Sequence, residues 1–173
     1  MEEFLNPLEI LKKIRLKESM TAADFGSGSG GWVIPLARKL EDGKVYAIDI
    51  LEEPLSALKS RADLEKITNI ETIQSDVENK GGSRLISSSC DLVLMTNLLF
   101  QCKDKKTVLE EAKRALREGG KILIVDWEID APKGPTEGRV SAEEIKEIAA
   151  NIGLKLEKDF EAGVYHYGLI FEK

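Results

Sequence analysis

The stretch Asp24-Phe25-Gly26-Ser27-Gly28-Ser29-Gly30-Gly31 decides the fold that the sequence predicts. It follows a short apolar run at 20–25, which suits a buried strand, and it precedes a helical pattern at 31–40. Glycines let the backbone approach a ligand closely and adopt positive φ angles. The start of a following helix offers free N–H groups and the positive end of a dipole. Such a first turn in an open α/β sheet binds a nucleotide-like ligand.

Segments with strand and helix patterns alternate along the rest of the chain. Helices are expected after Asn6-Pro7, after Glu53-Pro54, over 105–117 and after Ser141. Further strands are expected at 44–50, 70–74, 90–96, 121–126, 155–160 and 164–171. The last two are separated by a turn at 161–163 and should pair antiparallel. We therefore predict an α/β fold, a Rossmann-like three-layer sandwich with a mostly parallel seven-stranded sheet and an antiparallel terminal hairpin.

Composition limits the classes of protein that fit. A length of 173 residues predicts one domain, and a net charge of −6 gives no bulk attraction for nucleic acid. No apolar run reaches the roughly 18 residues that a membrane span needs, and the opening MEEFLNPLEI lacks the features of a signal peptide. Cys90 and Cys102 are too few for a disulfide framework or a four-ligand zinc site. We expect a cytoplasmic protein without a metal.

Three acidic residues accompany the glycine-rich turn. Asp49, at the end of the second strand, can accept hydrogen bonds from both hydroxyls of a ribose. Asp76, just after the third strand, can accept an adenine amino group. Asp24 precedes the first glycine, where its carboxylate would repel a pyrophosphate and attract an ammonium group. This pattern favours a nucleoside that carries a cationic amino acid.

The turn alone does not exclude a dinucleotide. Gly26, Gly28 and Gly31 match G-x-G-x-x-G, a pattern that equally suits a nicotinamide dinucleotide. Dinucleotide sites also use an acidic residue in the position of Asp49. An NAD(P)-binding oxidoreductase therefore stays open as an alternative.

From about residue 19 onward, the chain resembles the class I S-adenosylmethionine-dependent methyltransferases. The stretch ADFGSGSGGW resembles their first motif, Asp49 matches the acidic residue of the second strand, and SDVEN matches the third motif. DLVLMTNLLFQCKD and ALREGGKILIVDW resemble the segments around strands four and five. Within the superfamily, the chain is most similar to small methyltransferases of the quinone-biosynthesis type.

The resemblance implies S-adenosyl-L-methionine as cofactor and S-adenosyl-L-homocysteine as product. Asp24 would lie near the methionine ammonium, Asp49 would bind the ribose diol, and Ile50 would lie against the adenine. Asp76 and the N–H of Val77 would face the adenine edge. The full set of implied cofactor-binding residues is Asp24, Gly26, Ser27, Gly28, Gly30, Asp49, Ile50, Asp76, Val77, Asn97 and Leu98.

No catalytic residue stands out. Methyl transfer from a sulfonium is an in-line displacement in which positioning supplies much of the rate, and a base is needed only when the acceptor must lose a proton. Related enzymes often carry a histidine after strand four, but here that stretch reads TNLLFQ. His166 lies far away in sequence and is interpreted as part of a sheet face. The catalytic candidates are Gln101, Asp126 and Trp127.

We therefore predict a methyltransferase that acts on a small-molecule acceptor. A non-catalytic, adenosylmethionine-binding partner subunit stays open as a second alternative. The expected single domain spans 1–173, with an N-terminal helix within 1–18 and a Gly- and Pro-rich substrate loop at 128–140. Because the N-terminal segment is short, we expect this loop or a second protomer of a homo-oligomer to close the pocket.

Overall fold

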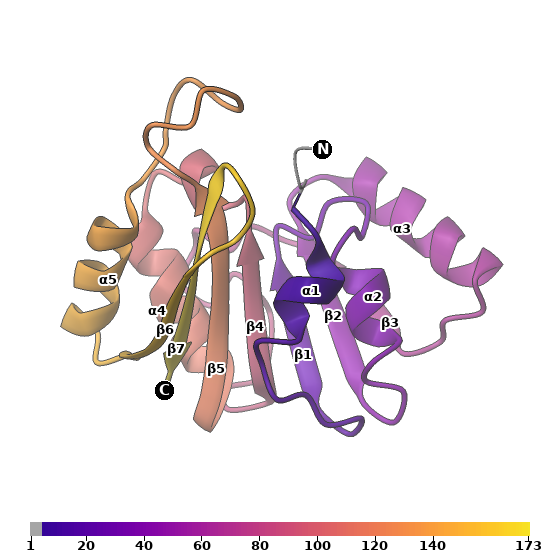
Figure 1. Cartoon of the computed structure of the whole chain (residues 1–173). Coiled ribbons are helices and arrows are strands. Elements are labelled where there is room, and N and C mark those ends of the chain that lie inside the picture. The colour runs from indigo at the N-terminus through magenta and orange to yellow at the C-terminus, as the bar shows by residue number, and fades with distance from the viewer. Residues whose placement is uncertain (1–4) are drawn as a thin grey trace.

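A computed structural model describes residues 5–173, and these form one twisted sheet with helices on both faces (Figure 1). The sheet has seven strands in the order β3-β2-β1-β4-β5-β7-β6. All neighbours are parallel except β5–β7 and β6–β7. This arrangement confirms the predicted fold class. The strands are β1 Thr21–Phe25, β2 Lys44–Asp49, β3 Ile70–Gln74, β4 Cys90–Thr96, β5 Leu116–Trp127, β6 Lys155–Glu161 and β7 His166–Glu172.

The first and last helices of the chain begin at the capping residues that the sequence indicates, whereas the helix expected to open at Glu53-Pro54 begins at Glu52 without a side-chain cap. The side chain of Asn6 accepts hydrogen bonds from two N–H groups of the first helical turn, and Ser141 accepts one from Glu144. Such caps satisfy donors that have no partner within the helix. Among residues 5–173, no helix is long and apolar enough to cross a membrane. The helices are α1 Pro7–Leu11, α2 Val33–Ala37, α3 Glu52–Leu64, η1 Leu99–Gln101, α4 Lys105–Ala115 and α5 Ala142–Asn151.

Alternating strand residues build two apolar layers. Ala22 of β1 packs into the layer that contains buried residues of α1, α2 and α3, whereas Ala23 packs into the layer formed with α4 and α5. Successive side chains of a strand point to opposite faces of the sheet, so each strand serves both layers. A residue's position along its strand therefore decides which layer it joins.

Two boundaries differ from the prediction. The helix expected over 31–40 has helical conformation only over Val33–Ala37. The helix expected to reach 117 ends at Ala115, and β5 begins at the next residue. Leu116 pairs with Cys90, and the pairing then shifts so that Lys121 lies opposite Leu92. The intervening glycines that indicated a helix end instead form an irregularity within the strand. Residues 1–4 of the expected N-terminal segment lie outside the described residues.

Candidate functional site

A cavity of about 440 Å³ opens at the carboxyl ends of β1, β2, β3 and β4. Ligands of open α/β sheets bind at this edge. The cavity brings together many residues that the sequence indicated. These are Gly26, Gly28, Asp49, Ile50, Asp76, Val77, Leu98 and Gln101. Asp24, Ser27, Gly30 and Asn97 lie beside it in the same turns and strand ends, but they do not line it.

The glycine-rich turn is held tightly against the end of β2. The N–H groups of Gly26 and Ser27 both donate to the carbonyl oxygen of Ile48, at 2.8 and 3.0 Å. Gly26 has a φ of +72°, and a Cβ added to it would lie 2.7 Å from Cδ1 of Leu98. Only glycine satisfies both conditions without rearrangement. The turn therefore presents bare backbone to the cavity.

The third glycine that the structure requires is Gly30, not Gly31. Gly30 has a φ of +89°, and an added Cβ would lie 2.3 Å from Cδ1 of Leu58 in α3. Gly31 has no positive φ and open space around the corresponding position. The G-x-G-x-x-G match through Gly31 is thus not a structural requirement of this turn. Gly30 allows close packing on α3 and does not line the cavity.

Asp49 joins the glycine turn to the segment before α3. Its Oδ2 accepts a hydrogen bond from the N–H of Gly28 at 2.8 Å, and its Oδ1 accepts one from Leu51 at 3.0 Å. Each carboxylate oxygen has a further lone pair, so these bonds fix the orientation of Asp49 and leave acceptor capacity for a ligand. Ile50 beside it is 59% exposed at the rim of the cavity.

Asp24 is buried without any partner. Its side chain is 1% exposed, and neither carboxylate oxygen has a hydrogen-bond partner. Burial raises the pKa of Asp24 to about 8, with a further contribution from the negative charge of Asp49. Asp24 therefore carries a proton in most molecules at neutral pH. A cationic group placed beside Asp24 would lower the pKa of its carboxyl group again and so favour the ionised carboxylate.

Two other polar side-chain atoms near the turn are also buried and unpartnered. They are Oγ of Ser27 and Oδ1 of Asn97, a residue with a φ of +51° directly after β4. Buried polar atoms in native structures are normally hydrogen-bonded, so such a cluster calls for an explanation. A polar ligand bound in the adjacent cavity explains the cluster, because it would provide these atoms with hydrogen-bond partners.

The far wall of the cavity comes from the loop after β3. Oδ1 of Asp76 accepts from the N–H of Glu78 at 2.9 Å, which fixes the turn that carries Val77. Oε2 of Glu78 in turn accepts from the N–H groups of Lys103 and Asp104, at 2.7 and 2.9 Å. Glu78 thereby connects the loop after β3 to the loop after η1. Residues of both segments line the cavity.

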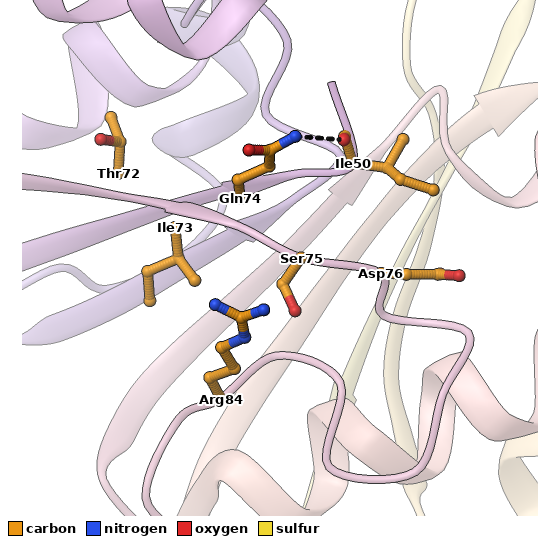
Figure 2. A pocket seen from close by; sticks show the side chains of 7 residues that line it. All are labelled: Ile50, Thr72, Ile73, Gln74, Ser75, Asp76 and Arg84. Atoms are coloured by element: carbon orange, nitrogen blue, oxygen red, sulfur yellow. Dashed lines mark hydrogen bonds between the residues drawn. The ribbon is translucent and has the colours of Figure 1, made fainter. Parts of the chain in front are cut away.

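A shallower groove of about 500 Å³ continues from this wall along β3 (Figure 2). Ile50, Ser75 and Asp76 line both the groove and the cavity. In Figure 2 the side chain of Gln74 reaches Ile50, and its Nε2 donates to the Ile50 carbonyl at 3.2 Å. This bond holds the main chain of Ile50 at the boundary between the two hollows.

The three catalytic candidates have different surroundings. Gln101 lines the cavity, and its Nε2 donates to the carbonyl of Asn97 at 2.9 Å. Asp126 is buried, and its carboxylate accepts N–H groups from Leu99 and Trp127, each at 2.8 Å. Burial raises the pKa of Asp126 to about 6. Neither Asp126 nor Trp127 lines the cavity, and the bonds of Asp126 hold η1 in place.

The 128–140 loop is organised by one arginine. The guanidinium of Arg139 donates to five carbonyl oxygens of the loop, at distances of 2.6 to 3.2 Å. Gly134 lies flat on the indole of Trp127, because a Cβ added to it would come within 2.5 Å of the ring. The loop therefore has a defined conformation over the end of β5.

Sequence analysis missed several residues that line the cavity: Leu51, Pro54, Ser75, Glu78 and Cys102. Leu51, Ser75 and Glu78 directly flank predicted ligand positions in sequence, so their neighbours gave a signal, and Pro54 was marked only as a helix start. Cys102 gave none. It is only 6% exposed, and its Sγ donates to the carbonyl of Leu98 at 3.4 Å. Burial raises the pKa of its thiol to about 12.

Comparison with known proteins identifies the family. A family model described as a methyltransferase domain matches residues 16–161. The chain belongs to this family. The structure of an S-adenosylmethionine-dependent methyltransferase from Aquifex aeolicus superposes on this methyltransferase domain with a TM-score of 0.87 and 29% identity. The match covers 96% of this chain and 89% of that one. The superfamily that the chain resembles in its sequence motifs is therefore confirmed.

The relatives of this methyltransferase act on different acceptors, as their names state. Demethylmenaquinone methyltransferase of Bacillus mycoides is 27% identical over 119 residues, which cover 68% of this chain and 49% of that protein. Release factor glutamine methyltransferase of Lactococcus lactis is 37% identical over 78 residues, covering 45% and 27%. The chain thus spans about half the length of the first relative, and likeness alone does not select an acceptor.

Proposed function

We propose that this methyltransferase domain transfers the methyl group of S-adenosylmethionine to a small-molecule acceptor. The observation that carries the proposal is the buried, unpartnered carboxyl of Asp24 beside a cavity bounded by Asp49. S-adenosylmethionine carries an ammonium group, which can pair with Asp24, and a ribose diol, which can donate to the remaining lone pairs of Asp49. When bound, the cofactor supplies a methyl group on a positively charged sulfur.

The residues around the cavity fit the remainder of that cofactor. Gly28 borders the cavity with open space where a Cβ would be, so its backbone can approach the ligand. The exposed side chain of Ile50 and the half-polar wall at Asp76 and Val77 suit the face and edge of an adenine. Ser27 and Asn97 offer buried polar atoms to the methionine end.

The oxidoreductase alternative fits less well. A pyrophosphate supplies no cation to pair with the buried carboxyl group of Asp24, and it would repel the ionised form of that group. The dinucleotide pattern also uses Gly31, which has neither a positive φ nor a close neighbour here. The second alternative is a non-catalytic subunit that binds the cofactor in the same cavity. Such a subunit would differ from the enzyme because it would be inactive without its partner. We propose a cytoplasmic, single-domain enzyme, whose pocket is closed by the 128–140 loop or by a second protomer.

Calorimetric titration with S-adenosylmethionine, S-adenosylhomocysteine and NADH tests the proposal. We expect binding of the first two ligands and none of NADH. At pH 7, binding should release about one proton, because Asp24, with a pKa of about 8, must ionise to pair with the ammonium group. The release is measured from the dependence of the binding enthalpy on the ionisation enthalpy of the buffer. Binding of NADH alone would contradict the proposed function.

A matched pair of glycine variants tests the position of the cofactor. Gly28→Ala places a methyl group in the open space beside the cavity, and we expect the affinity for S-adenosylhomocysteine to fall at least ~10-fold. Its φ of +51° adds a strain of about 1 kcal/mol to the folded state. Gly31→Ala, with ordinary φ and open surroundings, should bind within about twofold of the wild type. Equal affinities in calorimetry would place the cofactor elsewhere.

A further inference from the structure

Within residues 5–173, the buried side-chain polar atoms that lack a hydrogen-bond partner belong to four residues. They are Asp24, Ser27, Asn97 and His166. The first three lie at the strand ends and turns beside the cavity and are accounted for by the proposed cofactor. His166 is not. Its unpartnered atom is Nε2, and its side chain is only 7% exposed.

The antiparallel course of β7 brings His166 to the ligand-binding edge of the sheet. As the first residue of β7, it pairs with Trp127, the last residue of β5. Trp127 points to the same face as Val125, and Asp24 to the same face as Ala22, since residues two apart share a face. Val125 and Ala22 both belong to the layer of α1, α2 and α3.

His166 therefore projects from the same face as Asp24. Directly opposite residues of an antiparallel pair share a face, so His166 follows Trp127. Strands β4 and β5 lie between them in the sheet, at the edge where the cavity opens. Thr96 ends β4 in this interval, and it is buried. The imidazole thus stands on the side of β4 away from Asp49.

The imidazole is fixed by aromatic packing. Its ring centre lies 4.1 Å from that of Trp127 at an interplanar angle of 39°, and Gly134 of the loop covers the indole. The His166 side chain forms no hydrogen bond or ion pair within residues 5–173. Burial lowers the pKa of His166 below its ordinary value of 6.5. The ring is consequently neutral at pH 7 and can accept a proton.

The surroundings of His166 favour a neutral partner over a cationic one. No carboxylate of the described residues is hydrogen-bonded to the imidazole, and Asp126, the residue before Trp127, projects from the opposite face of β5. A bound ammonium group would add a lasting positive charge to that of the sulfonium without a counter-charge, whereas an imidazolium formed during transfer only replaces the charge that the sulfur loses. A hydroxyl group needs only one acceptor atom, and Nε2 provides it.

We propose that His166 binds the hydroxyl group of the methyl acceptor and removes its proton during transfer. This inference rests on the proposed function and specifies the substrate class as a hydroxyl compound. A lone pair of the acceptor oxygen forms the bond to the methyl carbon, and the carbon–sulfur bond breaks with its electron pair left on sulfur. The hydroxyl proton passes to Nε2, which gives an imidazolium that later releases the proton to water. Trp127 is a positioning residue that holds the ring.

Nuclear magnetic resonance tests this assignment directly, because His166 is the single histidine of the chain. Its ring nitrogens are followed in the free protein, with S-adenosylhomocysteine, and after addition of phenol, catechol or a hydroxynaphthalene. We expect a titration midpoint below that of an ordinary histidine. With S-adenosylhomocysteine bound, the hydroxyl probes should shift the Nε2 resonance. Aniline and a simple alkylamine should shift it less.

The variant His166→Gln separates proton removal from binding of the cofactor. We expect its affinity for S-adenosylhomocysteine to stay within twofold of the wild type, while methyl transfer to the most active hydroxyl probe falls at least ~100-fold. Glu172→Gln, at the opposite end of β7, is the matched control and should change neither quantity. Melting curves of both variants report whether β7 remains folded.

The outcomes distinguish the two proposals. If the wild type fails to bind S-adenosylhomocysteine, the proposed function fails. If it binds but no hydroxyl probe shifts the Nε2 resonance, the role of His166 is overturned and the proposed function stands. A larger shift with the amines overturns the hydroxyl class. Transfer by His166→Gln at the wild-type rate also overturns the role of the imidazole.

Discussion

Asp24→Asn is expected to stabilise the free protein at pH 9 by about 2–5 kcal/mol and to weaken S-adenosylhomocysteine binding at least ~30-fold. The pKa of Asp24 is raised to about 8 in the folded state, above its ordinary value of 3.8. The folded protein therefore holds a proton that the unfolded chain has lost. Stability falls as the pH rises from about 4 to about 8, and asparagine removes that loss.

Urea unfolding at pH 5, 7 and 9 measures this effect on the free protein. The difference between variant and wild type should grow with pH, because the cost of ionising the buried carboxyl is complete only above its raised pKa of about 8. Asp42→Asn, in the exposed turn before β2, is the control and should show no such trend. A variant less stable than the wild type at pH 9 would mean that Asp24 has a stabilising partner.

Asp49→Ala is expected to weaken S-adenosylhomocysteine binding at least ~100-fold, because two charge-assisted hydrogen bonds to the ribose contribute roughly 1.5–3 kcal/mol each. The fold should lose about 1–2 kcal/mol as well. The N–H groups of Gly28 and Leu51 lose the acceptor that orders the turn. Calorimetry measures the affinity, and denaturant unfolding measures the stability.

Asp49→Asn separates these two effects. Its remaining carbonyl oxygen can still accept one of the two backbone bonds, so stability should recover more than affinity does. Glu53→Ala, exposed in the first turn of α3, is the control for loss of a nearby negative charge. Unchanged affinity in both Asp49 variants would rule out the ribose role.

Local pattern was sufficient for the elements and for the core of the candidate site. The capped helices, the alternating strands and the glycine turn between Asp24 and Asp49 are all encoded within short windows of sequence. The first residue of β5 is not encoded in such a short window. Whether Leu116 ends a helix or begins a strand depends on its pairing with Cys90, which is a contact between distant segments.

The same limit applies to residues whose surroundings the sequence did not show. Cys102 is buried because the loop after η1 folds onto Glu78, and no periodicity marks that contact. Trp127 belongs to β5, beyond the strand expected over 121–126, because it pairs with His166 of the distant strand β7. His166 reaches the ligand edge only because β7 runs against β5. Because His166 is far in sequence from the glycine-rich turn and from Trp127, its place at the ligand-binding edge was not predicted.

The arginine that organises the 128–140 loop bears on how this domain could be adapted to new acceptors. Arg139 binds carbonyl oxygens, which every residue type possesses, so the loop conformation does not depend on the identity of most of its side chains. Substitutions over 129–137 can accumulate, naturally or in a designed library, while the backbone path is kept, except at Gly134, where the φ of +97° and the indole of Trp127 leave no room for a side chain. If this loop contacts the acceptor, as proposed, the bonds of Arg139 allow selectivity to change without loss of the fold.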